Sequence, residues 1–170
     1  MKLLAPRLFR DDRGYFFESY NQRVFAELGI PNHFVQDNHS CSSKGVLRGL
    51  HYQSEHVQGK LIRVLHGRIF DVAVDLRKSS PSFAQWVGYE LSDENKKLLW
   101  IPPGFAHGFV ALSDNAEVAY KATDFYAAMA EQCIVWNDVD LAIAWPLEGS
   151  PLVSKKDAEG VALRDALLFP

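Results

Sequence analysis

KGVLRGLHYQ, residues 44–53, is the segment around which the chain is organised. It is mostly apolar, carries two glycines, and places Arg48 three residues before His51. In a regular strand, side chains alternate between the two faces, so Arg48 and His51 would point in opposite directions. Gly49 is the residue that can bend the chain and bring them to one face. An ordinary strand with a surface Arg and a hydrogen-bonded core His explains the same letters equally well.

Other short extended segments lie on both sides of this one. They are rich in Val, Ile, Phe and Trp, and turn residues separate them. The expected strands are Leu3–Phe9, Phe34–Asn38, Lys60–His66, Arg68–Leu76, Gln85–Leu91, Lys97–Ile101, His107–Leu112 and Glu117–Tyr126. The linkers are too short for the crossover helices of a parallel sheet. The pattern therefore predicts an all-β fold, an antiparallel sandwich or jelly roll whose successive strands form hairpins.

One segment has a helical pattern. From Asn21 to Leu28 the sequence can be capped by Ser19 or Asn21 and is closed by Gly29. Its expected apolar face consists of Val24, Phe25 and Leu28. A second, short helical patch is expected between Ser154 and Leu167. We therefore expect only a few short helices beside the strands.

Length and composition describe an ordinary globular chain. The 170 residues are 48% apolar and 23% charged, which fits one domain spanning residues 1–170. A net charge of −3 argues against broad binding to nucleic acid or to anionic membranes, both of which need a basic surface.

The two cysteines, Cys41 and Cys133, have no metal-binding or redox spacing, and two free thiols are the default for an intracellular protein. The apolar run at the start is too short for a secretory signal, and no segment is long enough to span a bilayer. We expect a cytoplasmic protein.

Four short motifs follow one another in order. They are RGLHYQ at 48–53, QGKL at 58–61, DVAVDLR at 71–77 and GFAHGF at 104–109. Together they resemble the dTDP-4-dehydrorhamnose 3,5-epimerase family, and the resemblance runs from about Arg7 to the C-terminus. It implies a cupin-like jelly roll.

Metal binding is not expected. Cupin-type metal sites use a His-x-His pair, a Glu a few residues later and a His on a later strand, but here Gln53 follows His51. His51 and His107 without a convenient carboxylate fall short of the three protein ligands of a catalytic zinc. We predict no metal and no cofactor.

The resemblance implies proton transfer by two side chains, with His51 as the base and Tyr120 as the acid. A histidine titrates near neutrality, and a tyrosine stays protonated there, so the pair can act on opposite faces of a sugar ring. Lys60 would supply the fixed positive charge that a developing enolate needs. Without the resemblance, Tyr120 reads as a packing residue and Lys60 as a solvated strand end.

The carboxylate that orients His51 has two candidates. Asp157 matches the family's partner of the histidine, although sequence alone makes it a helix-capping residue. Asp71 is the rival, because it shares one strand face with Ala73 and Asp75 and would need a partner if it pointed inward.

A nucleotide-sugar substrate also needs groups that bind the diphosphate and the base. By resemblance the substrate-binding residues are Arg13, Glu18, Gln36, Asp37, Asn38, Arg48, His107, Tyr126, Glu131 and Lys156. Arginine suits phosphate oxygens, and Tyr126 falls where an aromatic ring stacks on thymine. Each residue taken singly reads as an ordinary polar surface residue.

The resemblance implies a cofactor-independent isomerase that converts dTDP-4-dehydro-6-deoxy-D-glucose to dTDP-4-dehydro-L-rhamnose in dTDP-L-rhamnose synthesis. The substrate's own C4 ketone acidifies C3 and C5. The alternatives are a C3-only epimerase or ketoisomerase of another deoxysugar pathway, and a non-catalytic sugar-nucleotide-binding jelly roll. Members of the family form dimers, and a jelly roll has edge strands that need to be covered. We therefore expect a homodimer, with no nucleic-acid or membrane partner.

Overall fold

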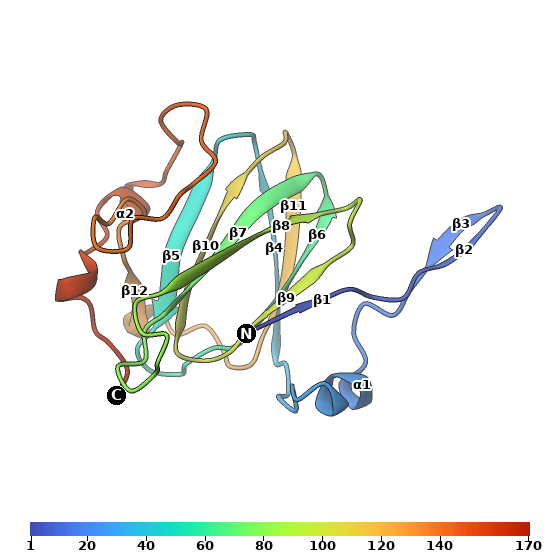
Figure 1. Ribbon diagram of the computed structural model, residues 1–170, viewed down its shortest axis with the longest axis horizontal. Coiled ribbons are helices and arrows are strands. Elements are labelled where there is room, and N and C mark those ends of the chain that lie inside the picture. Colours follow the sequence, from blue (N-terminus) through green and yellow to red (C-terminus); the bar gives the residue numbers. More distant parts are fainter.

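Two five-stranded antiparallel sheets face each other in the computed structural model, which describes residues 1–170 (Figure 1). The first sheet has the order β1-β9-β6-β11-β4 and the second β12-β5-β10-β7-β8. The strands of the first sheet are β1 Lys2–Leu4, β9 Leu98–Ile101, β6 Lys60–His66, β11 Ala116–Ala122 and β4 Gln36–Ser42. Those of the second are β12 Glu131–Cys133, β5 Leu47–Gln53, β10 Phe105–Ala111, β7 Arg68–Asp75 and β8 Trp86–Ser92. The fold is the predicted jelly roll.

The remaining elements lie outside the two sheets. A hairpin of β2 Phe9–Asp11 and β3 Gly14–Phe16 projects away from the body beside the helix α1 Gln22–Glu27 (Figure 1). At the other side lies α2 Lys155–Ala158, with short 3-10 turns at Ala128–Ala130 and Leu163–Asp165. None of these helices is long and apolar enough to cross a membrane.

The prediction that successive strands form hairpins is wrong for the two large sheets, except for β7 and β8, which pair with each other. The strands on either side of Gly67 illustrate the difference. β6 and β7 lie in different sheets, and each finds its partners elsewhere: β6 pairs with β9 and β11, and β7 pairs with β8 and β10. Gly67 adopts a φ of 73°, which lets the chain cross from one sheet to the other instead of folding back. The inward residues of β6 and β7 then pack against each other in a buried cluster between the sheets, as Ile62 and Ile69 illustrate.

Successive side chains of β7 point to opposite faces of its sheet, as expected. Ala73 faces the interior between the sheets, whereas Val72 and Val74 join a second buried cluster, covered by the C-terminal segment. Asp71 and Asp75 share the face of Ala73 and are fully buried. The strand therefore carries two carboxylates into the interior.

The helix forms where predicted, but its apolar face is only partly buried. The Asn21 side chain caps it by accepting hydrogen bonds from the backbone N–H groups of Arg23 and Val24. Phe25 is buried, whereas Val24 and Leu28 are each 42% exposed. Of the three residues of this face, only Phe25 joins the buried cluster with Leu61 and Leu98 of the first sheet.

A β-bulge in β5 lies at Gly49, as the sequence suggested. His51 pairs with His107 of β10, and Arg48 pairs with Phe109, so β5 has one residue more than β10 between these pairs. Gly49 has a φ of 120°, and a Cβ there would lie 2.5 Å from the Cα of Gly108. Only glycine fits this approach, and the extra residue turns Arg48 and His51 to the same face.

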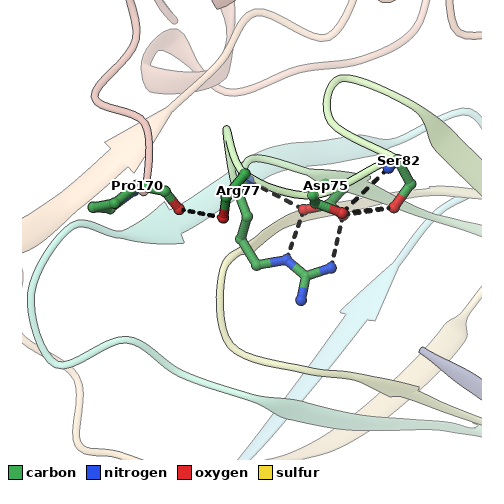
Figure 2. Close-up of polar contacts among 6 residues, drawn as sticks. Asp75, Arg77, Ser82 and Pro170 are labelled. Carbon is green, nitrogen blue, oxygen red and sulfur yellow. Dashed lines mark hydrogen bonds and ion pairs between the residues drawn. The ribbon is translucent and has the colours of Figure 1, made fainter.

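Asp75 organises the turn after β7 and lies beside the C-terminus (Figure 2). Arg77 donates from Nε and Nη2 to its two carboxylate oxygens, at 2.8 and 2.7 Å. Ser80 and Ser82 donate to Oδ2 at 2.6 and 2.7 Å. The neighbouring Ser79 hydroxyl donates to the carbonyl of Pro170 at 3.2 Å. Burial would raise the pKa of Asp75, but these hydrogen bonds outweigh it and hold the pKa well below its usual range.

Asp75→Asn should lower the free energy of unfolding by about 3 kcal/mol, the lower end for a broken buried pair, because the remaining Arg77 is 40% exposed. Urea unfolding at pH 7 measures the difference. Because the native pKa is depressed, the stabilisation is present above the unfolded pKa of about 3.9 and is lost as pH falls toward the native value. The exposed Asp12→Asn is the control, and equal stability of the two variants would refute the role of Asp75.

Candidate active site

A cavity of about 210 Å³ opens between the sheets where the bulge turns β5 inward. Both sheets contribute side chains to it. Its lining consists of Ser40, Arg48, His51, Tyr52, Gln53, Gln58, Lys60, His107, Phe109, Tyr120, Tyr126 and Glu131. Larger cavities exist, including one of about 380 Å³ on the outer face of the first sheet, but they contain neither His51 nor Lys60. The smaller cavity is therefore the candidate active site.

His51 is held by Asp157, which approaches from α2. Nε2 of His51 lies 2.5 Å from Oδ1 of Asp157, and the carboxylate is 3% exposed. Burial would raise the pKa of Asp157, but the hydrogen bond and charge of His51, with help from the Ser154 hydroxyl, lower it. An ionised Asp157 fixes the ring of His51 and stabilises its protonated form.

Asp71 has a different partner. Its Oδ2 lies 2.9 Å from Nε2 of His107, and its Oδ1 is buried without a hydrogen-bond partner. The structure thus pairs His51 with Asp157 and His107 with Asp71. Of the two candidates for orienting His51, the geometry selects Asp157.

Lys60 is a buried cation at the base of the cavity. Its Nζ lies 3.4 Å from the carbonyl oxygen of His51. Burial lowers the pKa of Lys60 to about 8, although the charges of Asp71 and Glu131 oppose the shift. An ammonium group shielded from water stabilises a developing negative charge more strongly than one on the surface.

Tyr120 lies on β11 in the first sheet, whereas His51 lies on β5 in the second, and both line the cavity. Burial raises the pKa of Tyr120, and the charge of Glu131 adds to the shift. Its phenol is therefore protonated at neutral pH. A proton acceptor and a proton donor face one cavity from opposite walls.

The rim of the cavity is polar and charged. The hydroxyl of Tyr126 donates to Glu131 at 2.8 Å, and Lys156 pairs with the same carboxylate. Arg48 is anchored through Nε to the hydroxyl of Ser42 at 3.0 Å. Arg48 is one of the residues that line the cavity and brings a positive charge to it.

The structure brings most of the predicted site residues together. Those that line the cavity are Arg48, His51, Lys60, His107, Tyr120, Tyr126 and Glu131. Asp157 and Lys156 contact this set directly. Gln36 and Asn38 lie nearby on β4: the Gln36 side chain donates to Asn38 at 2.9 Å and accepts from the Tyr126 backbone at 2.9 Å.

Three predicted residues do not reach the cavity of their own chain. Arg13 lies at the turn of the projecting β2–β3 hairpin and pairs with Asp11. Glu18 accepts a hydrogen bond from Asn21 at 3.0 Å. Asp37 points to the outer face of the first sheet and pairs with Lys121 at 2.9 Å. A substrate-binding role for these three stays a prediction.

Sequence reasoning missed Cys133 as a neighbour of the site. Its Sγ lies 3.9 Å from Oδ1 of Asp157, because β12 pairs with β5 and places Cys133 directly opposite His51. The sequence around Cys133 contains no motif, so only the pairing of β12 with β5 shows that this residue lies near the site. In the sequence, Gln53 stands only as the residue that breaks a His-x-His metal motif. In the structure, its side-chain oxygen accepts a hydrogen bond from the backbone N–H of Ala127 at 2.9 Å and so fixes the loop before β12.

Known proteins share both the sequence and the fold. A model of the dTDP-4-dehydrorhamnose 3,5-epimerase family matches residues 1–165. The dTDP-4-dehydrorhamnose 3,5-epimerase of Pseudomonas aeruginosa is 63% identical over 169 residues, covering 99% of this chain and 93% of that protein. The protein of the same name from Salmonella typhimurium is 58% identical, with 98% and 92% covered.

A solved structure agrees with the sequence match. The dTDP-6-deoxy-D-glucose-3,5-epimerase of Legionella pneumophila, in complex with dTDP-4-keto-L-rhamnose, has a TM-score of 0.93 and 53% identity, with 96% of this chain and 87% of that chain covered. The family model extends through every segment that lines the cavity. The chain belongs to the dTDP-4-dehydrorhamnose 3,5-epimerase family of isomerases.

Proposed function

We propose that the chain converts dTDP-4-dehydro-6-deoxy-D-glucose to dTDP-4-dehydro-L-rhamnose by inverting C3 and C5. The observation that carries the proposal is the placement of the His51–Asp157 pair and Tyr120 on opposite walls of one cavity. Inversion of a carbon needs a base on one face of the sugar and an acid on the other. The named functions of the relatives support the same reaction.

The reaction proceeds through an enolate. The C4 ketone of the substrate acidifies the neighbouring carbons, and His51 removes the proton while Asp157 stabilises the imidazolium that forms. Lys60 stabilises the negative charge on the enolate oxygen. Tyr120 then donates its proton to the same carbon from the other face. Repetition at the second carbon gives the doubly inverted product.

The rim residues are proposed to bind the nucleotide. Arg48 and Lys156 supply positive charge for the diphosphate, and Gln36, Asn38, His107 and Glu131 offer hydrogen bonds to the sugar and the base. Tyr126 is 54% exposed at the cavity mouth, so its ring is available to stack on thymine.

A homodimer is proposed from the shape of the N-terminal arm. The β2–β3 hairpin projects from the body and exposes Phe9, Tyr15 and Phe16, of which Phe16 is 67% exposed (Figure 1). Apolar surface of this kind is covered in stable assemblies. Exchange of the arm between two copies would also carry Arg13 and Glu18 toward the partner's cavity, which accounts for their predicted role.

The alternatives have less support. A C3-only epimerase would use the same acid and base, but the relatives named above carry the name of the 3,5-epimerase. A non-catalytic binding module has no need for Asp157 behind His51 or for a buried cation at Lys60.

His51→Ala should reduce turnover by about 10²–10⁴-fold, because the general base is lost. Incubation with the 4-keto sugar in D2O, with deuterium located at C3 and C5 by NMR, measures the effect. His107→Ala is the matched control, since its histidine also pairs with a buried carboxylate; it should weaken catalysis less. Exchange at the wild-type rate in His51→Ala would remove His51 from the mechanism.

Tyr120→Phe should separate proton exchange from inversion. The variant keeps His51 and Lys60, so the enolate still forms and His51 can return a solvent deuteron to the original face. We expect deuterium incorporation with retained configuration, and a loss of inverted product by about 10²–10⁴-fold. NMR in D2O follows both signals. Undiminished inversion would place the acid elsewhere, and Tyr126 would be tested next.

Light scattering at micromolar concentration should give twice the 19.2 kDa mass of one chain. Phe16→Ser should weaken dimerisation by about tenfold or more, since full burial of a phenylalanine contributes about 1.5–3 kcal/mol. Val139→Ser, which changes an 83% exposed apolar residue outside the arm, is the control. A wild-type monomer, or equal dimerisation by both variants, would contradict the proposed arm interface.

A further inference from the structure

Cys133 has no part in the proposed reaction, yet it lies beside the catalytic pair. It belongs to β12, directly opposite His51 of β5, and its thiol is free. Its only polar contacts are weak ones, at 3.7 Å to the carbonyl of Ile134 and 3.9 Å to Oδ1 of Asp157. A thiol, an imidazole and a carboxylate are all side-chain groups that bind metal ions.

The donor atoms of His51, Cys133 and Asp157 all lie within 4.8 Å of one another. Three separate elements hold them. Directly opposed residues of an antiparallel pair keep their side chains on one face, which fixes His51 and Cys133 together. Asp157 is held by α2, where its backbone N–H donates to the Ser154 hydroxyl at 3.1 Å.

This donor set suits Zn²⁺. Zinc binds imidazole nitrogen, thiolate sulfur and carboxylate oxygen at roughly 2.0–2.3 Å in a tetrahedron, which places its ligand atoms about 3.5 Å apart. Shifts of about 1 Å among the three side chains bring them to that spacing. His51 lines the cavity and Cys133 is half-buried, so an ion can reach the cluster from solvent.

The surrounding charges permit a dication. Asp157 is anionic and the thiol becomes anionic when zinc displaces its proton, so the site neutralises the ion. Lys156, a side-chain cation at the rim, is paired with Glu131. The positive charge of Lys60 opposes the binding of a cation and so lowers the affinity for zinc. EDTA should therefore remove the zinc readily.

We propose that His51, Cys133 and Asp157 form an inhibitory Zn²⁺ site. The proposal rests on the proposed function for its consequence: a bound ion occupies the carboxylate and the imidazole that together form the base. The proposed mechanism uses no metal, so a zinc ion bound here would stop it. The ligand is a soft divalent cation, and Mg²⁺, which prefers six oxygen ligands, should neither bind nor inhibit.

The experiment compares tag-free wild type, Cys133→Ser and Cys41→Ser in two assays. Cys41 is the other free cysteine; it is exposed and serves as the matched control. In the first assay each protein is titrated with Zn²⁺ and its epimerase activity is expressed relative to its own metal-free rate. Wild type and Cys41→Ser should be inhibited and then restored by EDTA. Cys133→Ser should need about tenfold more zinc or greater, since even loss of an outer-shell partner costs 10–100-fold in affinity.

The second assay does not depend on activity. Co²⁺ replaces Zn²⁺ as a coloured probe, and a thiolate ligand gives a charge-transfer absorption in the near ultraviolet. The band should appear in wild type and Cys41→Ser and be absent from Cys133→Ser. Cys133→Ala repeats the test with a second side chain if the serine variant folds poorly.

The outcomes separate the two proposals. Equal zinc sensitivity of Cys133→Ser and wild type, or no thiolate band in wild type, overturns the zinc site. An epimerase assay without turnover in metal-free wild type overturns the proposed function, while the cobalt band still decides the metal site.

Discussion

The close approach of Gly49 to Gly108 is the constraint on which the active site is built. A Cβ at Gly49 would lie 2.5 Å from the Cα of Gly108, so the two strands meet there at glycine distance. The extra residue of the bulge shifts the alternation of β5 by one step. Without that shift, Arg48 and His51 would occupy opposite faces and no single cavity could use both.

The strand segments could be read from the sequence, but their partners could not. The strand at Lys60–His66 was predicted with its exact bounds, because alternation and the flanking glycines mark it locally. The pairing across Gly67 was wrong, because alternation reports which side chains face inward and not which strand lies alongside. In α1, Val24 and Leu28 have the spacing of a buried face, yet only Phe25 of that face is buried.

The same limit applies to the site. A match of motifs nominated His51, Lys60 and Tyr120, and the fold places all three around one cavity. The choice between Asp71 and Asp157 required the three-dimensional arrangement, since both carboxylates suit a histidine partner. Cys133 became visible only through the pairing of β12 with β5.

The pairing of His51 with Asp157 joins residues 106 positions apart in the chain. The C-terminal segment that supplies Asp157 adds no strand to either sheet. It is held by isolated bridges, such as Ile134 with Val161, and by apolar side chains, such as Leu163, that pack against the second sheet. The backbone of this segment therefore makes few of the regular hydrogen bonds that hold the strands together. Segments with few regular hydrogen bonds also open locally before the whole molecule unfolds. Opening of the last residues alone would therefore separate Asp157 from His51 while both sheets stay folded.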